Sequence, residues 1–369
     1  MTLTKAEEHA ALPQPRPQQI GYAVIGLGKL TLEELLPAFA VGRASRLAAV
    51  VSGDPAEARE AALAYGLTEA DAYSYDDFEK LGERSDVHAV YIVLPNSLHR
   101  EYTERAARIG KHVLCEKPLA TTVEDAEAMV QACKDAGVLL MTAYRCQYTP
   151  HHWAARDAVQ SGRLGQVKLI HSVNVQVEPN EGQWRLKEKL AGGGSLPDVG
   201  LYCVNTVRFL LGEEPYEVSG TVHSTPGDER FAEVEESVTW QMRFPSGVVA
   251  QCACSYGAAT ARSLDVFGTE GRLALDPAFD YQNLRLTVQT GQDVTEVRVP
   301  PADQFQLETD HFSRCIQEGR APYTPGEEGV QDQKIMAAIY RSAREGGRPV
   351  ALERLDGRDV FRGAPPERS

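Results

Sequence analysis

Three side chains in this sequence could together move a proton from an alcohol. Lys117 stands in Cys115-Glu116-Lys117-Pro118, and Asp198 and Tyr202 stand four residues apart after a glycine run. Residues four apart share one face of a helix. A tyrosine beside a lysine can take a hydroxyl proton while hydride leaves the same carbon, because the cation stabilises the phenolate. We predict Lys117, Asp198 and Tyr202 as catalytic residues, although singly they could be a surface lysine, a helix cap and a core aromatic.

A glycine turn marks a candidate phosphate-binding site. The segment Gly26-Leu-Gly28-Lys29-Leu30-Thr31 follows a predicted strand and opens a predicted helix, which is the context of a dinucleotide-binding turn. Gly26 permits the tight turn, and Gly28 lets the backbone approach a pyrophosphate at the helix N-terminus. We predict that Gly26, Gly28, Lys29 and Leu30 bind a nucleotide, and the alternative is a glycine turn with a structural role only.

The end of the second predicted strand bears on which dinucleotide binds. NAD-dependent proteins place Asp or Glu there to accept from the ribose hydroxyls, and here Ser52 holds the position. A serine hydroxyl can donate to a 2′-phosphate, and Arg59, Arg43 or Arg46 could supply positive charge. Asp54 favours NAD unless it only caps the next helix. We therefore favour NADP, and NAD stays the alternative.

Further polar residues follow the parallel strands at the same edge of the predicted sheet. Leu94-Pro95-Asn96-Ser-Leu-His99 follows one strand and Glu116 ends the next. In open α/β sheets, ligands bind at this carboxyl edge. We predict cofactor contacts from these residues, namely Leu94, Pro95, Asn96, His99, Glu116 and Lys117. His99 could instead only begin a helix.

The hydrophobic pattern predicts the domain that positions these residues. Short apolar strands at 20–25, 47–51, 87–94, 112–115 and 138–143 alternate with helical patterns. Strands that alternate with helices form a parallel sheet with helices on both faces. Residues 20–146 are therefore predicted to form a doubly wound α/β domain of the Rossmann type.

After about residue 150 the pattern changes to strands linked by hairpins. A strand is predicted at 167–177, and further strands follow one another from about 216 to 299, the fourth of these at 263–268. Strands joined by hairpins pair antiparallel. Helices are predicted at 150–161, 199–211, 304–318 and 327–344. Residues 147–369 are predicted to form an α+β domain on a large, mostly antiparallel open sheet. An open face needs covering, so we expect a homodimer or homotetramer.

Composition and charge exclude several classes of function. The chain has 369 residues, 43% of them apolar, and a net charge of −14, which suits a globular protein of about two domains. An acidic surface repels phosphate backbones, so we expect no nucleic-acid partner and no anionic membrane partner. No segment approaches ~18 consecutive apolar residues, and the first residues hold no twin-arginine signal. We expect a soluble, cytoplasmic protein.

Two remaining features carry weaker expectations. Residues 1–19 are polar and then proline-rich, so they are predicted to be an extended arm or a disordered tail. The seven cysteines include Cys252 and Cys254, which alternate along a predicted strand. With no His or Cys partner at metal spacing, we expect both to be small buried side chains and we predict no metal site.

In order and spacing, the motifs resemble the Gfo/Idh/MocA oxidoreductases, and within them the glucose–fructose oxidoreductase branch. The matching segments are GLGKL, LPNSLH, CEKPLATT, YRCQY, QWRLKEKLAGGGSLPDVGLY and PGEEGVQD, which span about residues 20–346. The resemblance implies a Rossmann domain and a C-terminal α/β domain whose open sheet face makes oligomer contacts. It also implies hydride transfer between a nicotinamide and a sugar carbon.

The resemblance also implies roles for individual residues. Lys117, Arg145, Asp198, Tyr202 and Tyr281 match substrate-side positions, where many members have His in place of Tyr202. Arg145, Trp184 and Arg185 match positions near the cofactor. Ser52 is shared with the NADP-retaining branch, whereas Glu57 replaces a lysine of that branch.

We hypothesise an NADP-dependent aldose oxidoreductase. Sugar C1 would lose hydride, and Tyr202 would take the O1 proton with Lys117 activating it. Asp198, Arg145 and Tyr281 would position hydroxyls while the lactone forms. A second sugar could then be reduced by a tightly retained cofactor. The alternatives are an ordinary sugar or inositol dehydrogenase with exchangeable NAD(P), and a nucleotide-sensing regulator without catalysis.

Overall fold

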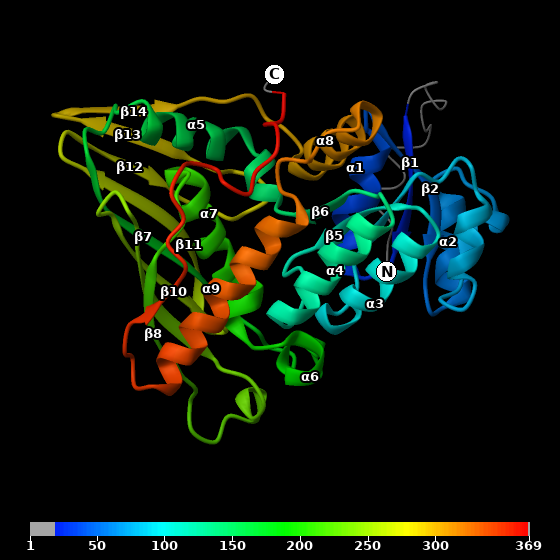
Figure 1. Ribbon diagram of the computed structural model, residues 1–369, viewed down its shortest axis with the longest axis horizontal. Helices are drawn as coiled ribbons and strands as arrows, with labels where there is room; N and C mark the ends of the chain where they lie inside the picture. The colour runs from blue at the N-terminus through cyan, green and yellow to red at the C-terminus, as the bar shows by residue number, and fades with distance from the viewer. Residues whose placement is uncertain (1–18, 368–369) are drawn as a thin grey trace.

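A six-stranded parallel sheet forms the first half of the protein (Figure 1), whose computed structural model describes residues 19–367. The strand order is β3-β2-β1-β4-β5-β6. The bounds are β1 (Ile20–Ile25), β2 (Ser45–Val51), β3 (Ala72–Tyr73), β4 (Ala89–Ile92), β5 (His112–Glu116) and β6 (Leu140–Ala143). The predicted doubly wound sheet is confirmed, whereas the predicted arm lies outside the described residues except for Gln19.

Helices cover both faces of this sheet because its strands are apolar on both sides. Tyr22 and Val24 belong to one buried cluster and Ala23 and Ile25 to the other. The helices of this half are η2 (Thr31–Leu35), α1 (Leu36–Ala40), α2 (Pro55–Ala64), α3 (His99–Arg108) and α4 (Val123–Asp135). Asp54 caps α2, where its carboxylate accepts from two backbone N–H groups. Its predicted alternative role as a helix cap is thereby confirmed.

Helix α8 (Gln304–Glu318) comes late in the chain but packs on the first sheet. Its residues Phe305 and Phe312 lie in the same buried cluster as Tyr22. Asp310 accepts hydrogen bonds from the backbone N–H groups of Arg43, Ala44 and Ser45 at 2.8–3.1 Å. The first domain is therefore completed by a helix from the second half of the sequence.

The second half is built on a nine-stranded sheet in the order β14-β13-β12-β11-β7-β10-β9-β8-β15. Only β7 and β10 pair parallel. The bounds are β7 (Val167–Val177), β8 (Glu217–His223), β9 (Ser237–Arg243), β10 (Val249–Ser255), β11 (Gly257–Gly268), β12 (Gly271–Leu275), β13 (Leu286–Thr290), β14 (Asp293–Val297) and β15 (Val350–Ala351). Helices α5 (Pro150–Gln160), α7 (Leu201–Leu211) and α9 (Gly326–Arg344) pack on one face (Figure 1). The predicted large, mostly antiparallel sheet is confirmed.

The structure differs from the predicted elements at several boundaries. Strand β11 begins at Gly257, earlier than the predicted 263, because its first residues are small or polar and carry no apolar alternation. The predicted helix at 199–211 is preceded by a π-helix, η8 (Leu196–Gly200), which runs into α7. The two-residue strands β3 and β15 are too short to show any period.

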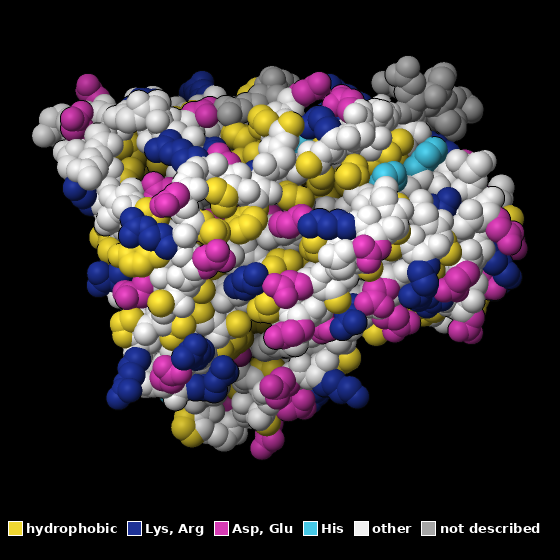
Figure 2. All heavy atoms as spheres, in the orientation of Figure 1, with side chains coloured by type: hydrophobic (Ala, Val, Ile, Leu, Met, Phe, Trp, Pro, Cys, Tyr) yellow, Lys and Arg dark blue, Asp and Glu magenta, His cyan; other side chains and the backbone are white. Residues whose placement is uncertain are grey.

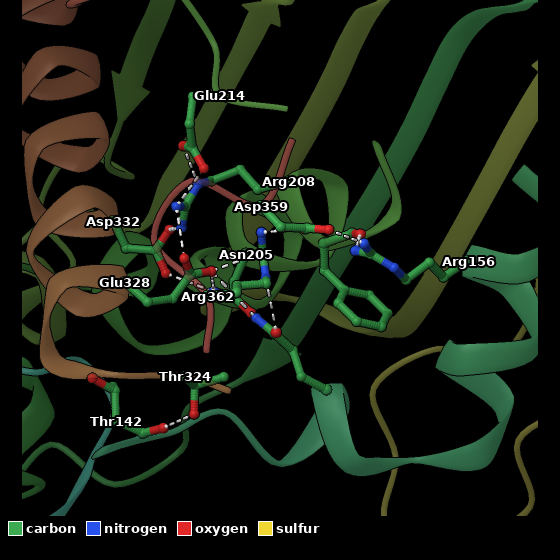
Figure 3. A network of polar contacts seen from close by, with 12 residues as sticks. Thr142, Arg156, Asn205, Arg208, Glu214, Thr324, Glu328, Asp332, Asp359 and Arg362 are labelled. Carbon is green, nitrogen blue, oxygen red and sulfur yellow. Dashed lines mark hydrogen bonds and ion pairs between the residues drawn. The ribbon is translucent and has the colours of Figure 1, made fainter. Parts of the chain in front are cut away.

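A closed network of buried charges joins α7 and α9 to the C-terminal segment (Figure 3). Arg208 has no exposed side-chain surface and forms ion pairs with Glu214, Glu328 and Asp332. Arg362 reaches the same cluster and pairs with Glu328 at 2.7 Å. These contacts fasten the last described segment of the chain to the helical layer.

The face drawn in Figure 2 and the cysteines add no candidate site. Acidic and basic side chains are interspersed over the face drawn in Figure 2. Cys252 and Cys254 are buried, as predicted, and the described cysteines are all free thiols. Within residues 19–367, no helix is long and apolar enough to cross a membrane, and no group of three or more His, Cys, Asp or Glu could hold a metal ion.

Candidate active site

A cleft of about 960 Å³ joins the carboxyl edge of the first sheet to the second domain. It is lined by the predicted site residues except Arg59 and His99. Those that line it are Gly26, Gly28, Lys29, Leu30, Ser52, Leu94, Pro95, Asn96, Glu116, Lys117, Arg145, Trp184, Arg185, Asp198, Tyr202 and Tyr281. One cleft thus brings together residues far apart in the sequence.

The glycine turn has the geometry that a pyrophosphate needs. Gly26 adopts φ +96°, and a Cβ there would lie 2.4 Å from the carbonyl oxygen of Val93. A Cβ on Gly28 would have no atom within 4 Å, so the backbone is open to the cleft. Thr31 donates to the Gly26 carbonyl at 2.7 Å and closes the turn. No side chain caps η2, which leaves its N-terminus available to an anion.

The cleft end beside β2 holds a serine and a carboxylate rather than an arginine. Ser52 donates to Glu57 at 2.7 Å, and both line the cleft. Arg59 is exposed and outside the lining, because α2 turns its alanine face to the sheet. Arg46 pairs with Asp86 at the opposite end of β2. The structure therefore corrects the prediction that these arginines supply charge to the cofactor.

His99 lies behind the cleft and positions its walls. The ring is fully buried, with Nδ1 2.9 Å from the Pro118 carbonyl oxygen and Nε2 2.9 Å from the Leu94 carbonyl oxygen. It thereby ties the loops after β4 and β5 together. The predicted direct cofactor contact is replaced by a contact between two loops.

The central contact of the site is an ion pair between the domains. Lys117 Nζ lies 2.9 Å from both Oδ1 and the backbone oxygen of Asp198. Burial opposes the charge on Lys117, but the facing Asp198 and Tyr202 outweigh it and raise its pKa. Burial would raise the pKa of Asp198, but Lys117 and Arg185 hold it below its usual range. Both members are therefore charged near neutral pH.

Two cations, Arg145 and Lys117, contact Tyr202 in different ways. Arg145 Nε donates to Tyr202 Oη at 3.0 Å. Lys117 Nζ instead lies over the ring, 4.8 Å from its centroid. Arg145 is held in place by Gln304 and by the Phe279 carbonyl, both at 2.7 Å. The predicted Lys117 thus lies beside Tyr202, and Arg145 makes the direct hydrogen bond to its hydroxyl.

The glycine run before Asp198 lets the backbone pack closely against Glu235. A Cβ on Gly194 would lie 2.1 Å from the Glu235 carbonyl oxygen. The Glu235 carboxylate accepts from the N–H groups of Gly194 and Leu196 at 2.8 and 2.9 Å. These contacts set the start of η8, which carries Asp198.

Several residues that line the cleft or support its wall are absent from the sequence-based prediction. Tyr256 donates to Asp198 Oδ2 at 2.7 Å, although in the sequence it looks like a core aromatic after a strand. The predicted Arg185 also reaches Oδ2, at 3.3 Å. Unpredicted residues that line the cleft include Glu57, Asn174, Gln176, Arg262 and Asp280. Strand alternation could have placed Asn174 and Gln176 on one face, but it does not tell which face meets the cleft.

Comparisons with known proteins agree with this architecture. Residues 20–144 match the oxidoreductase family with an NAD-binding Rossmann fold, and residues 156–352 match the family's C-terminal alpha/beta domain. The chain is 35% identical to D-xylose 1-dehydrogenase [NADP(+)] of Haloarcula marismortui, over 91% of this chain and 93% of that protein. It is 34% identical to 1,5-anhydro-D-fructose reductase of Ensifer adhaerens, over 78% and 86%.

A solved structure with similar folding in both domains is the aldose-aldose oxidoreductase of Caulobacter crescentus in complex with glycerol. It has a TM-score of 0.88 and 42% identity, covering 90% of this chain and all of that one. The family models match both domains, so the chain is a member of the Gfo/Idh/MocA oxidoreductases.

Proposed function

We propose that the protein is an NADP-dependent aldose oxidoreductase that converts the C1–OH of a cyclic sugar to a lactone. The observation that carries this proposal is the juxtaposition of Lys117, Asp198, Tyr202 and Arg145 in a cleft that also contains the Gly26–Gly28 turn. Similar proteins named for sugar chemistry, a xylose dehydrogenase and an aldose-aldose oxidoreductase, support the substrate class.

The residues divide the reaction between binding and proton transfer. A nicotinamide cofactor, when bound, supplies the hydride acceptor. Tyr202 Oη is placed to take the O1 proton, and the cations of Arg145 and Lys117 stabilise negative charge on that oxygen. Asp198, which stays ionised, orients the Lys117 ammonium, and one N–H of that ammonium is left for a sugar oxygen. Tyr281, stacked on Arg145 at the rim, would bind the sugar ring.

The residues present fit a dinucleotide. Gly28 leaves backbone open to the cleft, and the uncapped N-terminus of η2 favours the pyrophosphate. Lys29, Leu30 and Asn96 would flank it. The NADP-dependent relative and Ser52 support NADP. Glu57 beside Ser52 would accept from a ribose hydroxyl, which leaves NAD as the weaker ligand rather than an excluded one.

We further propose that the cofactor is retained and that a second sugar is reduced in the same site. The aldose-aldose oxidoreductase with 42% identity favours this version. The NADP-dependent xylose dehydrogenase favours the second candidate, a dehydrogenase whose cofactor leaves in each cycle. Both candidates use the same Lys117, Asp198 and Tyr202 chemistry.

One experiment separates the two candidates. The protein is purified without added nucleotide and denatured, and the released nucleotide is identified and quantified. Near-stoichiometric NADP(H) supports retention, and turnover of glucose without added cofactor should then require a second aldose. Empty protein that forms lactone only with added NADP supports the dehydrogenase. Absence of lactone under both conditions would refute the aldose assignment.

We also propose that the second domain joins copies of the chain through its open sheet face. Leu169, Val173 and Val175 on β7 point away from the helices and are only partly buried, and Val177 is 49% exposed. A row of aliphatic side chains on an uncovered sheet favours association. Light scattering should show a dimer or tetramer, and Val173→Asp should shift it toward the monomer.

A further inference from the structure

The cleft continues along β7 beyond the reacting centre. Asn174, Gln176 and Glu178 alternate along the chain, so they share one face, and all three line the cleft. Asn174 donates to the Val199 carbonyl at 3.0 Å, next to Asp198. Four residues of extended chain span about 13 Å, which is longer than one sugar ring. The cleft wall thus extends past the position that a single aldose would occupy.

This outer part is lined by polar groups that hold one another in place. Arg262 donates to Gln176 Oε1 at 3.0 Å and forms an ion pair with Asp280. Because Oε1 is occupied, the NH₂ group of Gln176 is left for a ligand. Amide, guanidinium and carboxylate groups that are held in place suit hydroxyls, which both donate and accept.

The outer part is linked to the reacting centre and open at its far end. Arg145, which binds Tyr202, also holds the Phe279 carbonyl directly before Asp280. Gln282 and Asn283 line the cleft and are exposed, and Glu178 lines it and is half-buried. Described residues therefore do not close the cleft beyond Gln176, and a longer ligand could extend outward.

We propose that this outer subsite binds the second sugar ring of a disaccharide or oligosaccharide whose reducing end is oxidised. The inference rests on the proposed aldose oxidation. In the reaction, C1 of the reducing-end ring loses hydride to the nicotinamide cofactor and O1 loses its proton, giving the lactone. The glycosidic bond to the second ring stays intact. Gln176, Arg262 and Asp280 hold the hydroxyls of that second ring.

The test compares glucose with maltose and cellobiose as substrates. In the unaltered protein, at least one disaccharide should be oxidised with a kcat/KM no lower than that of glucose. Gln176→Ala should lower the ratio of disaccharide to glucose kcat/KM by about tenfold, the effect of one lost hydrogen bond. Arg262→Gln should lower it similarly. Gln131→Ala, an exposed glutamine on α4, is the matched control and should leave the ratio unaltered.

A binding measurement complements the kinetics. Saturation-transfer NMR on the intact protein should show contacts to protons of the non-reducing ring, weakened by Gln176→Ala. If the protein oxidises glucose but neither maltose nor cellobiose, the proposed subsite is overturned and the proposed function stands. A Gln176→Ala variant whose KM rises for the cofactor instead would also overturn it. Failure with every aldose would overturn both proposals.

Discussion

Two clusters of buried charge in this protein serve different ends, one inside the second domain and one between the two domains. In the closed network, Arg208 contacts Glu214, Glu328 and Asp332 (Figure 3), and it does not line the cleft. In the cleft, Lys117 and Asp198 form a pair that faces an open space. Buried charge by itself therefore does not mark a catalytic site. A catalytic site is indicated when a buried charged group faces a cavity and still has a donor or acceptor that no protein atom uses.

The two clusters also shift carboxyl groups in opposite directions. Asp198 faces two cations, Lys117 and Arg185, which keep its pKa below the usual range despite burial. Burial and the neighbouring Glu328 raise the pKa of Asp332 to about 6, although Arg208 opposes this. Asp198 in the cleft therefore stays ionised over a wide pH range, whereas Asp332 in the closed network binds a proton already near pH 6.

The largest expected effect is on turnover. Lys117→Met should lower kcat by about 10²–10⁴-fold, because the positioned cation beside Tyr202 and Asp198 is lost. The matched control is Lys111→Met, since buried Lys111 donates only to the backbone carbonyls of Arg84 and Val87. Steady-state kinetics on folded protein should show that the control keeps its turnover. Equal turnover in both variants would remove Lys117 from the reaction.

The next effect should appear in stability and not in turnover. Arg208→Met removes the cation that Glu214, Glu328 and Asp332 share, and of these Glu328 keeps Arg362. This change should lower the free energy of unfolding by about 3–5 kcal/mol. Urea denaturation measures this loss. The kcat per folded molecule should stay near the original value. If Arg208→Met kept its native stability but had a strongly reduced kcat, the two clusters would not differ in the way described.

The titration of Asp332 gives a smaller, pH-dependent effect. The folded protein binds this proton more tightly than the unfolded chain, whose Asp has a pKa of about 4. The free energy of unfolding should therefore fall as pH rises from about 4 to about 6. Relative to Asp332→Asn, the unaltered protein should lose about 2–3 kcal/mol across this window. Parallel stability curves for the two proteins would contradict a raised pKa.

The smallest effect concerns the cleft end beside β2. Glu57→Gln removes a negative charge next to Ser52 and should improve the preference for NADP over NAD by about five- to tenfold. Glu60→Gln is the control, because Glu60 is exposed on the same helix outside the lining. KM values for both cofactors measure the preference. An unaltered preference in Glu57→Gln would place the 2′-phosphate away from this carboxylate.

Local motifs made much of this site predictable from sequence. The Gly26–Gly28 turn, Lys117 and the Asp198–Tyr202 spacing each depend on neighbours in the chain, and the structure brings them into one cleft. Partners from distant segments were not predictable in this way. The Arg145–Tyr202 hydrogen bond spans 57 residues, and the contact between Tyr256 and Asp198 spans 58.

The sequence did not predict which face of helix α2 is directed toward the cleft. Arg59 and Glu57 both lie in the first turns of α2, and only packing of the alanine face decides that Glu57 faces the cleft. The early start of β11 was missed because Gly257–Ala261 lacks an apolar period. The parallel strands were predicted well because burial on both faces leaves continuous apolar runs.

The position of α8 has a consequence for how the protein is made. The first sheet is synthesised early, whereas α8 lies more than 250 residues later in the chain. Helix α8 packs on Tyr22, and its Asp310 accepts a hydrogen bond from Ser45 at the start of β2. A growing chain therefore leaves the part of the sheet's apolar face under α8 exposed until synthesis passes residue 318. Folding of the early domain is coupled to completion of the late one. Amide exchange on a fragment ending at residue 146 should show β1 poorly protected.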